Sequence, residues 1–191
     1  MLSRSRFRLI LAIALALTLL PASPALAAMS RTLVMARATG WVDAVIPYSQ
    51  TGWANLDGVI VDSPSLGWRR DCSGFASMAW NLPMPGASTR TLASYADSIQ
   101  KDALLPGDMM LKSGEHAVIF GGWTGSERTH YWAYEMSASQ SDKYGDGSVR
   151  RETPYPYWGE DYGYQPYRLK GITDDIDSSA SVKPIQGADR Y

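Results

Sequence analysis

The sequence predicts an α+β domain, with helices in the first half of the chain and an antiparallel sheet in the second. Apolar residues recur at helical spacing between residues 30 and 46. Beyond residue 108 the chain changes to short apolar runs separated by turn residues, which is typical of a strand meander. About 164 residues follow the expected leader, enough for one domain with a substantial core.

Residues 1–27 are expected to be a signal peptide. Three arginines precede an apolar run over residues 9–20, which is short for a membrane span. Ala25-Leu26-Ala27 then forms a small-x-small cleavage sequence. We therefore expect a secreted protein that begins near Ala28 and has no stable membrane insertion after processing.

The charge balance of the mature chain is acidic. Removal of the three leader arginines leaves 15 basic and 19 acidic residues, a net charge of −4. This balance argues against a nucleic-acid partner, since nucleic-acid-binding proteins usually carry a basic balance. Residues 28–171 are expected to form a single monomeric domain. Residues 172–191, which are polar and acidic without periodicity, are expected to form a C-terminal tail.

Three helices are predicted in the first half, over residues 30–46, about 72–81 and 88–99. Ser30 can cap the first helix, and Pro47 ends it. The stretch between the first two helices, residues 52–70, carries Gly, Asn, Asp, Ser and Pro. It is predicted to be a surface loop that can hold a short strand at residues 58–61.

The second half is predicted to contain strands at residues 109–111, 116–123, 131–136, 148–153 and 167–169. If Gly122 faces Tyr131 in the hairpin, Glu135 faces Val118 and lies on the same side of the sheet as His116. A slip of one residue would move Glu135 to the other face, so this register matters.

Cys72 is the only cysteine in the sequence. In an exported protein a lone thiol pairs with another chain, is inert in the core, or is chemically used. Its position at a predicted helix start favours a chemical role for the thiol. The helix dipole and the free N–H groups stabilise a thiolate, and the N–H groups can also face an oxyanion. Ser73 and Gly74 are small and allow close approach to the thiol.

His116 is the preferred base of the two histidines, because a strand holds it rigidly, whereas His130 ends a polar hairpin loop. Glu135 is the preferred residue to orient His116, because it is the one charge in an apolar strand and needs a partner if half-buried. Asp108 is a rival that we interpret as a turn residue. Glu115 adjoins His116 but is expected to point to the opposite face.

Three segments in order resemble the NlpC-type family of papain-like cysteine peptidases, whose members cleave peptides of the bacterial cell wall. They are Asp71-Cys72-Ser73-Gly74-Phe75, Leu105-Pro106-Gly107-Asp108 and His116-Ala117-Val118-Ile119-Phe120. The resemblance covers about residues 30–140. It implies a papain-like fold, with N-terminal helices packed on an antiparallel sheet, and no cofactor.

The same resemblance implies roles for individual residues. Cys72 corresponds to the nucleophile and His116 to the base. Glu135 falls where the family often has a third catalytic histidine. Tyr48 matches a tyrosine that contributes to the oxyanion site, and we group Ser73 with it as an oxyanion or substrate residue.

The sequence therefore predicts a secreted, cell-wall-associated cysteine hydrolase of amide bonds, with peptidoglycan stem peptides as the implied substrate. Two other functions stay open. One is an amidase of the N-acetylmuramoyl-L-alanine type, which cuts between sugar and peptide. The other is a non-catalytic wall-binding module on the same fold.

Each site residue also has a structural interpretation. Cys72 and His116 can be inert core residues, and Tyr48 can serve packing alone. Glu135 can be a solvated residue or an ion-pair partner of Arg150 or Arg151, and Asp71 is interpreted as a helix cap. The aromatic segment 155–167 is interpreted as core and edge packing rather than a sugar platform. No metal site is expected, because the histidines and the cysteine lack ligand spacing.

Overall fold

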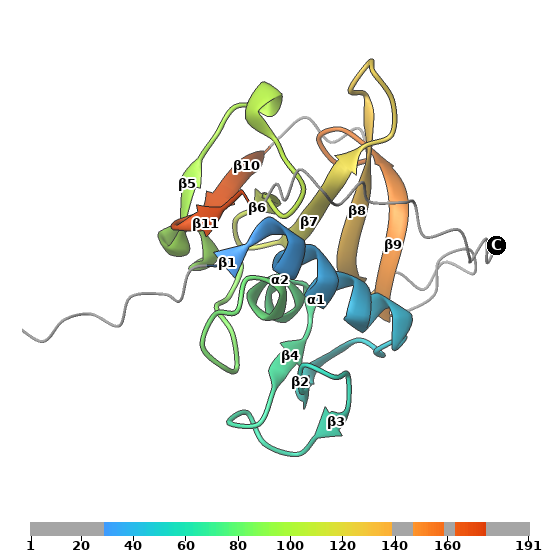
Figure 1. Ribbon diagram of the computed structural model, residues 1–191. Coiled ribbons are helices and arrows are strands. Elements are labelled where there is room, and N and C mark those ends of the chain that lie inside the picture. The colour runs from blue at the N-terminus through green and yellow to red at the C-terminus, as the bar shows by residue number, and fades with distance from the viewer. Residues whose placement is uncertain (1–28, 139–146, 159–162, 175–191) are drawn as a thin grey trace, which may run out of the picture.

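The computed structural model describes residues 29–138, 147–158 and 163–174, which Figure 1 shows as a coloured ribbon. The predicted signal peptide lies outside the described residues, and so does most of the predicted tail. No helix in the described ranges is long and apolar enough to cross a membrane.

The described residues form three sheets. The largest has six strands in the order β5-β10-β6-β7-β8-β9, and all neighbours are antiparallel. Its strands are β5 (Ala96–Ser98), β6 (Met109–Lys112), β7 (His116–Trp123), β8 (His130–Ser137), β9 (Gly147–Pro154) and β10 (Tyr164–Leu169). A three-stranded sheet contains β2 (Ser49–Ala54), β3 (Ile60–Val61) and β4 (Trp68–Arg70), and β1 (Met29–Ser30) pairs in parallel with β11 (Ile172–Thr173).

Two α-helices precede the main sheet in the chain. Helix α1 (Arg31–Asp43) begins at Ser30, whose hydroxyl accepts a hydrogen bond from the Leu33 N–H as predicted. Helix α2 (Cys72–Ala79) contacts β7 and β8, and α1 contacts α2, β8 and β9 (Figure 1). The chain therefore combines few helices with antiparallel sheets, the composition that the sequence predicts.

Two predictions for the first half are wrong. Residues 88–99 do not form a third helix but a short 3₁₀ turn, η1 (Leu92–Tyr95), followed by β5. Strand β5 pairs with β10, some 70 residues later in the chain, and helical periodicity carries no information about such a pairing. Residues 52–70 hold the short strand expected at 58–61, as β3, but the rest is not a plain loop, because the stretch contributes most of the sheet β2-β3-β4 (Figure 1).

The predicted tail begins with ordered residues. Ile172 and Thr173 form β11 and pair with Met29 and Ser30, so the two ends of the described chain lie side by side.

Apolar side chains cover both faces of the main sheet. Met109 and Ile119 pack into one cluster together with side chains of α1 and α2. Their sequence neighbours Met110 and Val118 point the other way, into a second cluster that includes Tyr131 and Tyr164. A carboxylate on either face is therefore removed from water and must be compensated by partners.

The hairpin β7–β8 has the predicted register where it affects the site. Ile119 pairs with Tyr134, and continuation of that pairing places Glu135 opposite Val118. The prediction fails nearer the turn, where Tyr131 pairs with Trp123 rather than with Gly122 because a bulge shifts the ladder by one residue. Gly122 adopts φ +118°, which glycine tolerates better than other residues.

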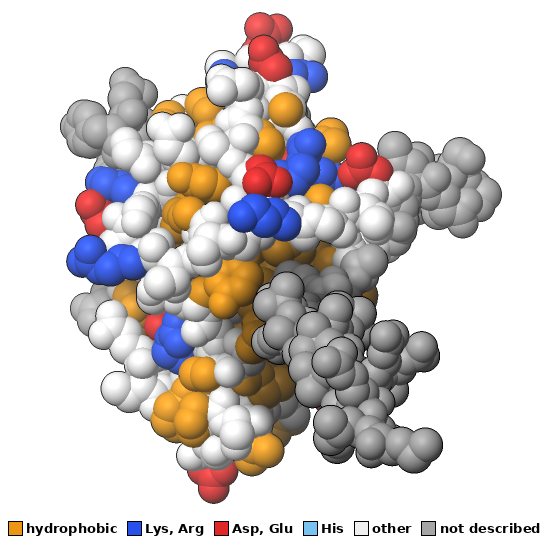
Figure 2. Space-filling model, turned by 90° about the vertical axis from the view of Figure 1, so that its left-hand side faces the viewer, with side chains coloured by type: hydrophobic (Ala, Val, Ile, Leu, Met, Phe, Trp, Pro, Cys, Tyr) orange, Lys and Arg blue, Asp and Glu red, His pale blue; other side chains and the backbone are white. Residues whose placement is uncertain are grey.

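The side of the molecule that carries β5 and β11 has a mixed surface. Figure 2 shows basic and acidic side chains interspersed with apolar ones on this side, with no extended area of one charge.

Candidate active site

Cys72 is the first residue of α2, and its thiol is half-buried. The Asp71 carboxylate caps the helix by accepting a hydrogen bond from the Gly74 N–H at 2.6 Å. The Cys72 Sγ lies 3.8 Å from the Glu115 carbonyl oxygen and donates to it. The helix start thus directs the thiol toward the beginning of β7.

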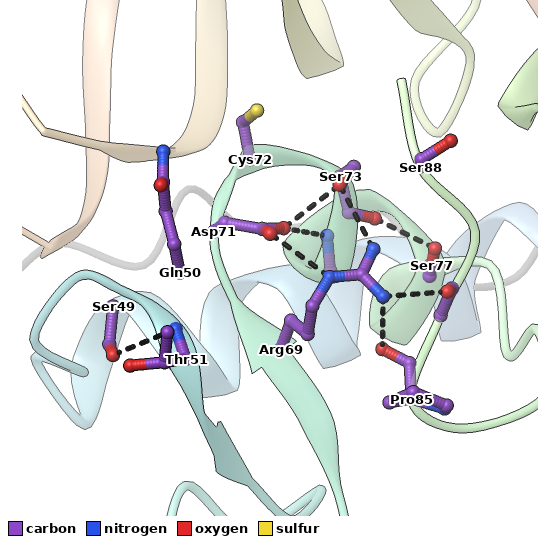
Figure 3. Close-up of polar contacts among 12 residues, drawn as sticks. Ser49, Gln50, Thr51, Arg69, Asp71, Cys72, Ser73, Ser77, Pro85 and Ser88 are labelled. Carbon is purple, nitrogen blue, oxygen red and sulfur yellow. Dashed lines mark hydrogen bonds and ion pairs between the residues drawn. The ribbon is translucent and has the colours of Figure 1, made fainter. Parts of the chain in front are cut away.

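Arg69 holds the start of α2 in place. Its Nε donates to Asp71 Oδ2 at 3.0 Å, and its Nη2 donates to the Ser73 hydroxyl at 3.2 Å and to the Ala87 carbonyl at 2.6 Å. Figure 3 shows that the Cys72 side chain points away from this network. Arg69 and its partners therefore support the helix end and leave the thiol side of the turn open.

The structure gives Ser73 and Gly74 roles that differ from the expected ones. The Ser73 hydroxyl is buried and donates to Asp71 Oδ1 at 2.9 Å, so it faces the Arg69 network rather than the thiol (Figure 3). A Cβ at position 74 would lie 2.0 Å from the Arg69 carbonyl oxygen. Glycine is needed there because α2 packs closely against β4.

His116 begins β7, between its two predicted partners. Its Nε2 lies 2.6 Å from Glu135 Oε2, and the Cys72 side chain lies close enough to the imidazole to affect its pKa. Burial alone would lower the His116 pKa, but the hydrogen bonds and charges of Cys72 and Glu135 outweigh burial and raise the pKa to about 10. The imidazole is therefore cationic at neutral pH.

Glu135 is completely buried and receives three hydrogen bonds. Arg151 Nε donates to Oε1 at 2.8 Å, while the Tyr157 hydroxyl, at 2.8 Å, and His116 share Oε2. Burial would raise the Glu135 pKa, but the hydrogen bond and charge of His116 and then of Arg151 lower the pKa below its ordinary value. Glu135 is therefore not a solvated residue; it contacts His116 and pairs with Arg151, one of the two arginines considered from the sequence.

Tyr157 is the site residue that the sequence did not single out. It follows β9, and its hydroxyl lies 3.3 Å from His116 Nε2. Its ring centroid is 5.2 Å from that of His116. Burial and the charge of Glu135 raise the pKa of Tyr157, so its hydroxyl keeps its proton. Nothing in the spacing of the aromatic segment distinguishes this tyrosine from its neighbours.

The other candidates lie in different surroundings. Tyr48 precedes β2, packs against the first cluster and accepts a hydrogen bond from Gln50 Nε2 at 3.1 Å. His130 is exposed and contacts the Thr129 hydroxyl at 3.1 Å. Glu115 is exposed and pairs with Lys112 at 2.8 Å.

Asp108 is more than a turn residue. It accepts a hydrogen bond from the Leu105 N–H, as a turn aspartate does, but it is also fully buried. Its carboxylate forms ion pairs with Arg31 at 2.9 Å and with Arg168 at 2.8 Å. These contacts join α1, β6 and β10, so the role of Asp108 is structural.

Metal binding finds no support in the described ranges, where no group of three or more His, Cys, Asp or Glu side chains could hold an ion. A thiol at a helix start, a cationic imidazole and a buried carboxylate can together perform nucleophilic catalysis.

Comparisons with known proteins give a distant likeness among solved structures. No protein-family model matches the sequence, and no curated protein matches it either. Among solved structures, the chain is similar to the peptidoglycan hydrolase RipB from Mycobacterium tuberculosis, with a TM-score of 0.45 and 17% sequence identity. The match covers 75% of this chain and 65% of that chain. A likeness this distant identifies neither a family nor an activity.

Proposed function

We propose that this protein is a secreted cysteine hydrolase that cleaves amide bonds, with Cys72 as nucleophile, His116 as general base and acid, and Glu135 as the residue that orients His116. The observation that carries the proposal is the position of His116, which hydrogen-bonds the buried carboxylate of Glu135 and lies close enough to Cys72 for the thiol to affect its pKa. A papain-like fold, with the helices packed on the sheet, is part of this proposal.

The first chemical step forms a thioester. With the proton on His116, the Cys72 thiolate attacks the carbonyl carbon of the substrate amide, and the carbonyl oxygen becomes an oxyanion. The imidazolium then donates its proton to the amide nitrogen as the C–N bond breaks. The amine leaves, and the acyl group remains on Sγ.

The second step releases the acid. His116, now neutral, takes a proton from water, and the resulting hydroxide attacks the thioester carbonyl. The C–S bond breaks, the carboxylic acid departs, and the thiolate–imidazolium pair is restored. Glu135 stays ionised throughout and stabilises the imidazolium in both steps.

Oxyanion stabilisation is assigned to donors near the thiol. The backbone N–H of Cys72, at the positive end of α2, is the first donor. The Tyr48 hydroxyl is the second donor in this proposal. Of the polar groups of Ser73, only the backbone N–H is assigned to the oxyanion, because the hydroxyl faces the Arg69 network.

The proposed substrate is a peptide bond in peptidoglycan stem peptides. This choice is supported by the three sequence segments that resemble NlpC-type peptidases and by the expected export of the chain. An acidic mature chain is compatible with a peptide substrate and does not favour a nucleic acid.

The test is incubation of the purified secreted protein with peptidoglycan, followed by mass analysis of the released fragments. Shortened stem peptides are expected, and the Cys72→Ala variant should release none. Intact stem peptides freed from glycan would indicate the amidase instead. Binding to walls without any cleavage by the unmodified protein would indicate the non-catalytic module.

A further inference from the structure

Glu135 belongs to a network that is larger than a catalytic triad. Its two carboxylate oxygens receive hydrogen bonds from three side chains, which come from three different segments. His116 is on β7, Arg151 is on β9, and Tyr157 follows β9. Resting on the proposed function, we propose that Arg151 and Tyr157 are positioning residues that hold Glu135 as an anion and aim its Oε2 at His116.

The direction of each hydrogen bond in this network is determined by chemistry. A guanidinium has donors only, so Arg151 must donate both to Glu135 Oε1 and, through Nη2 at 3.0 Å, to the Tyr157 oxygen. Since that oxygen accepts from Arg151, the Tyr157 proton is directed to Glu135 Oε2. An imidazolium likewise only donates, so Glu135 must be an acceptor at both oxygens.

This arrangement differs from a simple buried ion pair. A guanidinium and a carboxylate paired only for stability commonly form two parallel hydrogen bonds. Here Arg151 contacts one carboxylate oxygen and uses another nitrogen to bind Tyr157. The second oxygen is thereby left to His116 and Tyr157, which is the arrangement that a base-orienting carboxylate requires.

Other charged and titratable groups face the network. Tyr131 lies on the same strand as Glu135, and its hydroxyl donates to the Pro156 carbonyl at 3.1 Å. The groups that act on Glu135 from the packed elements are His116, Arg151, Tyr157 and Tyr131, and Cys72 acts on His116 from α2. Arg151 is the permanent cation among them, so it favours the ionised form of Glu135 at any pH.

The decisive variant is Tyr157→Phe, which removes one hydroxyl and keeps the ring. Tyr155→Phe is its matched control, since the Tyr155 ring packs against Trp123 and Lys101 instead of the carboxylate. The measurement is the rate at which iodoacetamide alkylates Cys72 at neutral pH. This rate requires no wall substrate, and Cys72 is the only thiol in the chain.

We expect Tyr157→Phe to slow alkylation by roughly three- to tenfold, within the range that coupled side chains show. A less firmly held carboxylate aims the imidazolium less well at Cys72, so the cation activates the thiol less. Tyr155→Phe should stay within about twofold of the unmodified protein, as expected for a position without such coupling. A wild-type rate for Tyr157→Phe would overturn the proposal.

A double-mutant cycle tests whether Tyr157 acts through Glu135. In a Glu135→Gln background, Tyr157→Phe should cause no further loss, because the carboxylate that it positions is gone. An equal loss in both backgrounds would show that the hydroxyl acts independently of Glu135, and the proposal would fail.

Arg151 is tested by a change of charge. Arg151→Met removes a cation and a donor, so the pKa of Glu135 should rise and the low-pH limb of alkylation should move to higher pH. Arg151→Lys keeps the cation and should return the limb toward its wild-type position. If Arg151→Met does not fold, the Tyr157 cycle still decides the proposal.

These results are separable from the proposed function. If walls are cut but Tyr157→Phe reacts like the unmodified protein, the positioning proposal fails and the hydrolase proposal stands. If walls are not cut but the effects of the two substitutions on alkylation are non-additive, the positioning proposal stands and the hydrolase proposal fails.

Discussion

Cys72 is supported by residues close to it in the sequence, whereas His116 is supported by residues from distant parts of the chain. Asp71 caps α2 from the preceding position, and Arg69 binds Asp71 across two residues. His116 is separated by 19 residues from Glu135 and by 41 from Tyr157. The nucleophile thus depends mainly on local capping, and the base on a tertiary network.

The two networks also differ in their surroundings. The side chains of Arg69 and Asp71 are 21% and 15% exposed, so water weakens their ion pair. Glu135 is fully buried, and Arg151 is 7% exposed. Electrostatic interactions are stronger where water is excluded. We therefore expect changes at the base network to alter chemistry more, and changes at the cap to alter mainly local stability.

The largest effect is expected from Cys72→Ala, which removes the reacting atom itself. Hydrolysis of wall fragments should be abolished, while the free energy of unfolding should change by no more than about 1 kcal/mol because the thiol is half-exposed. Fragment analysis and thermal unfolding measure the two quantities. Full activity of the pure variant would exclude the enzyme assignment.

The base is tested next, by comparing His116→Ala with His130→Ala. Loss of His116 should reduce turnover by roughly a thousandfold or more, as for a member of a catalytic triad. His130→Ala is the control and should have little effect, since His130 is exposed at the hairpin end. An inactive His130 variant with an active His116 variant would reverse the assignment.

Glu135→Gln should lower turnover by roughly ten- to a thousandfold. An amide presents a donor where the carboxylate accepts, and it removes the charge that keeps His116 protonated. The high-pH limb of activity, expected near the His116 pKa of about 10, should move to lower pH. Glu115→Gln makes the same change at an exposed residue next to His116 and should leave the high-pH limb of activity in place. If both variants had the same turnover and the same pH profile, Glu135 would not belong to the site.

The pH dependence of the free energy of unfolding follows from the pair His116 and Glu135. The His116 pKa is raised above its ordinary value of 6.5. Its contribution to the free energy of unfolding is therefore complete below pH 6.5 and is lost as the pH rises through about 10. The Glu135 pKa is lowered below its ordinary value of 4.5. Its contribution to the free energy of unfolding is therefore present above pH 4.5 and is lost as the pH falls through the lowered pKa. Glu135→Gln should flatten both trends in unfolding experiments.

The smallest effect is expected at the cap. Asp71→Ala removes the acceptor for Gly74 N–H and should cost about 0.5–2 kcal/mol of unfolding free energy. Activity should fall by less than in Glu135→Gln, because the thiol–imidazole pair remains. The control is Asp57→Ala, at an exposed aspartate. If Asp71→Ala were the more damaging variant for turnover, the comparison between the two networks would be wrong.

Local signals in the sequence were sufficient for some elements. Ser30 and Asp71 cap helices as predicted, because capping depends on residues within one turn. Strand β7 has its predicted bounds, and Glu135 lies on the predicted face of the sheet, although a bulge shifts the pairing that was assumed at the turn. The proposed roles of these residues stay predictions until the variants are measured.

Non-local pairing decided what the sequence did not reveal. Residues 96–98 join β10 instead of extending a helix, and the stretch 52–70 contributes to a sheet. Gly74 seemed suited to substrate approach, but the packing of α2 on β4 explains it. For β5 the deciding contact is with β10, which lies far outside the window in which periodicity and turn chemistry operate.

The sequence by itself determined the helix start that presents Cys72 and the strand that carries His116, whereas the face of Glu135 also depended on a bulge near the turn. Capping and strand alternation are short-range geometry, so they can be followed residue by residue. Only the tertiary structure brought Arg151 and Tyr157 to Glu135 and buried all three groups together. The charge states of the site depend on that burial, because desolvation and the distances between distant side chains exist only in the folded chain.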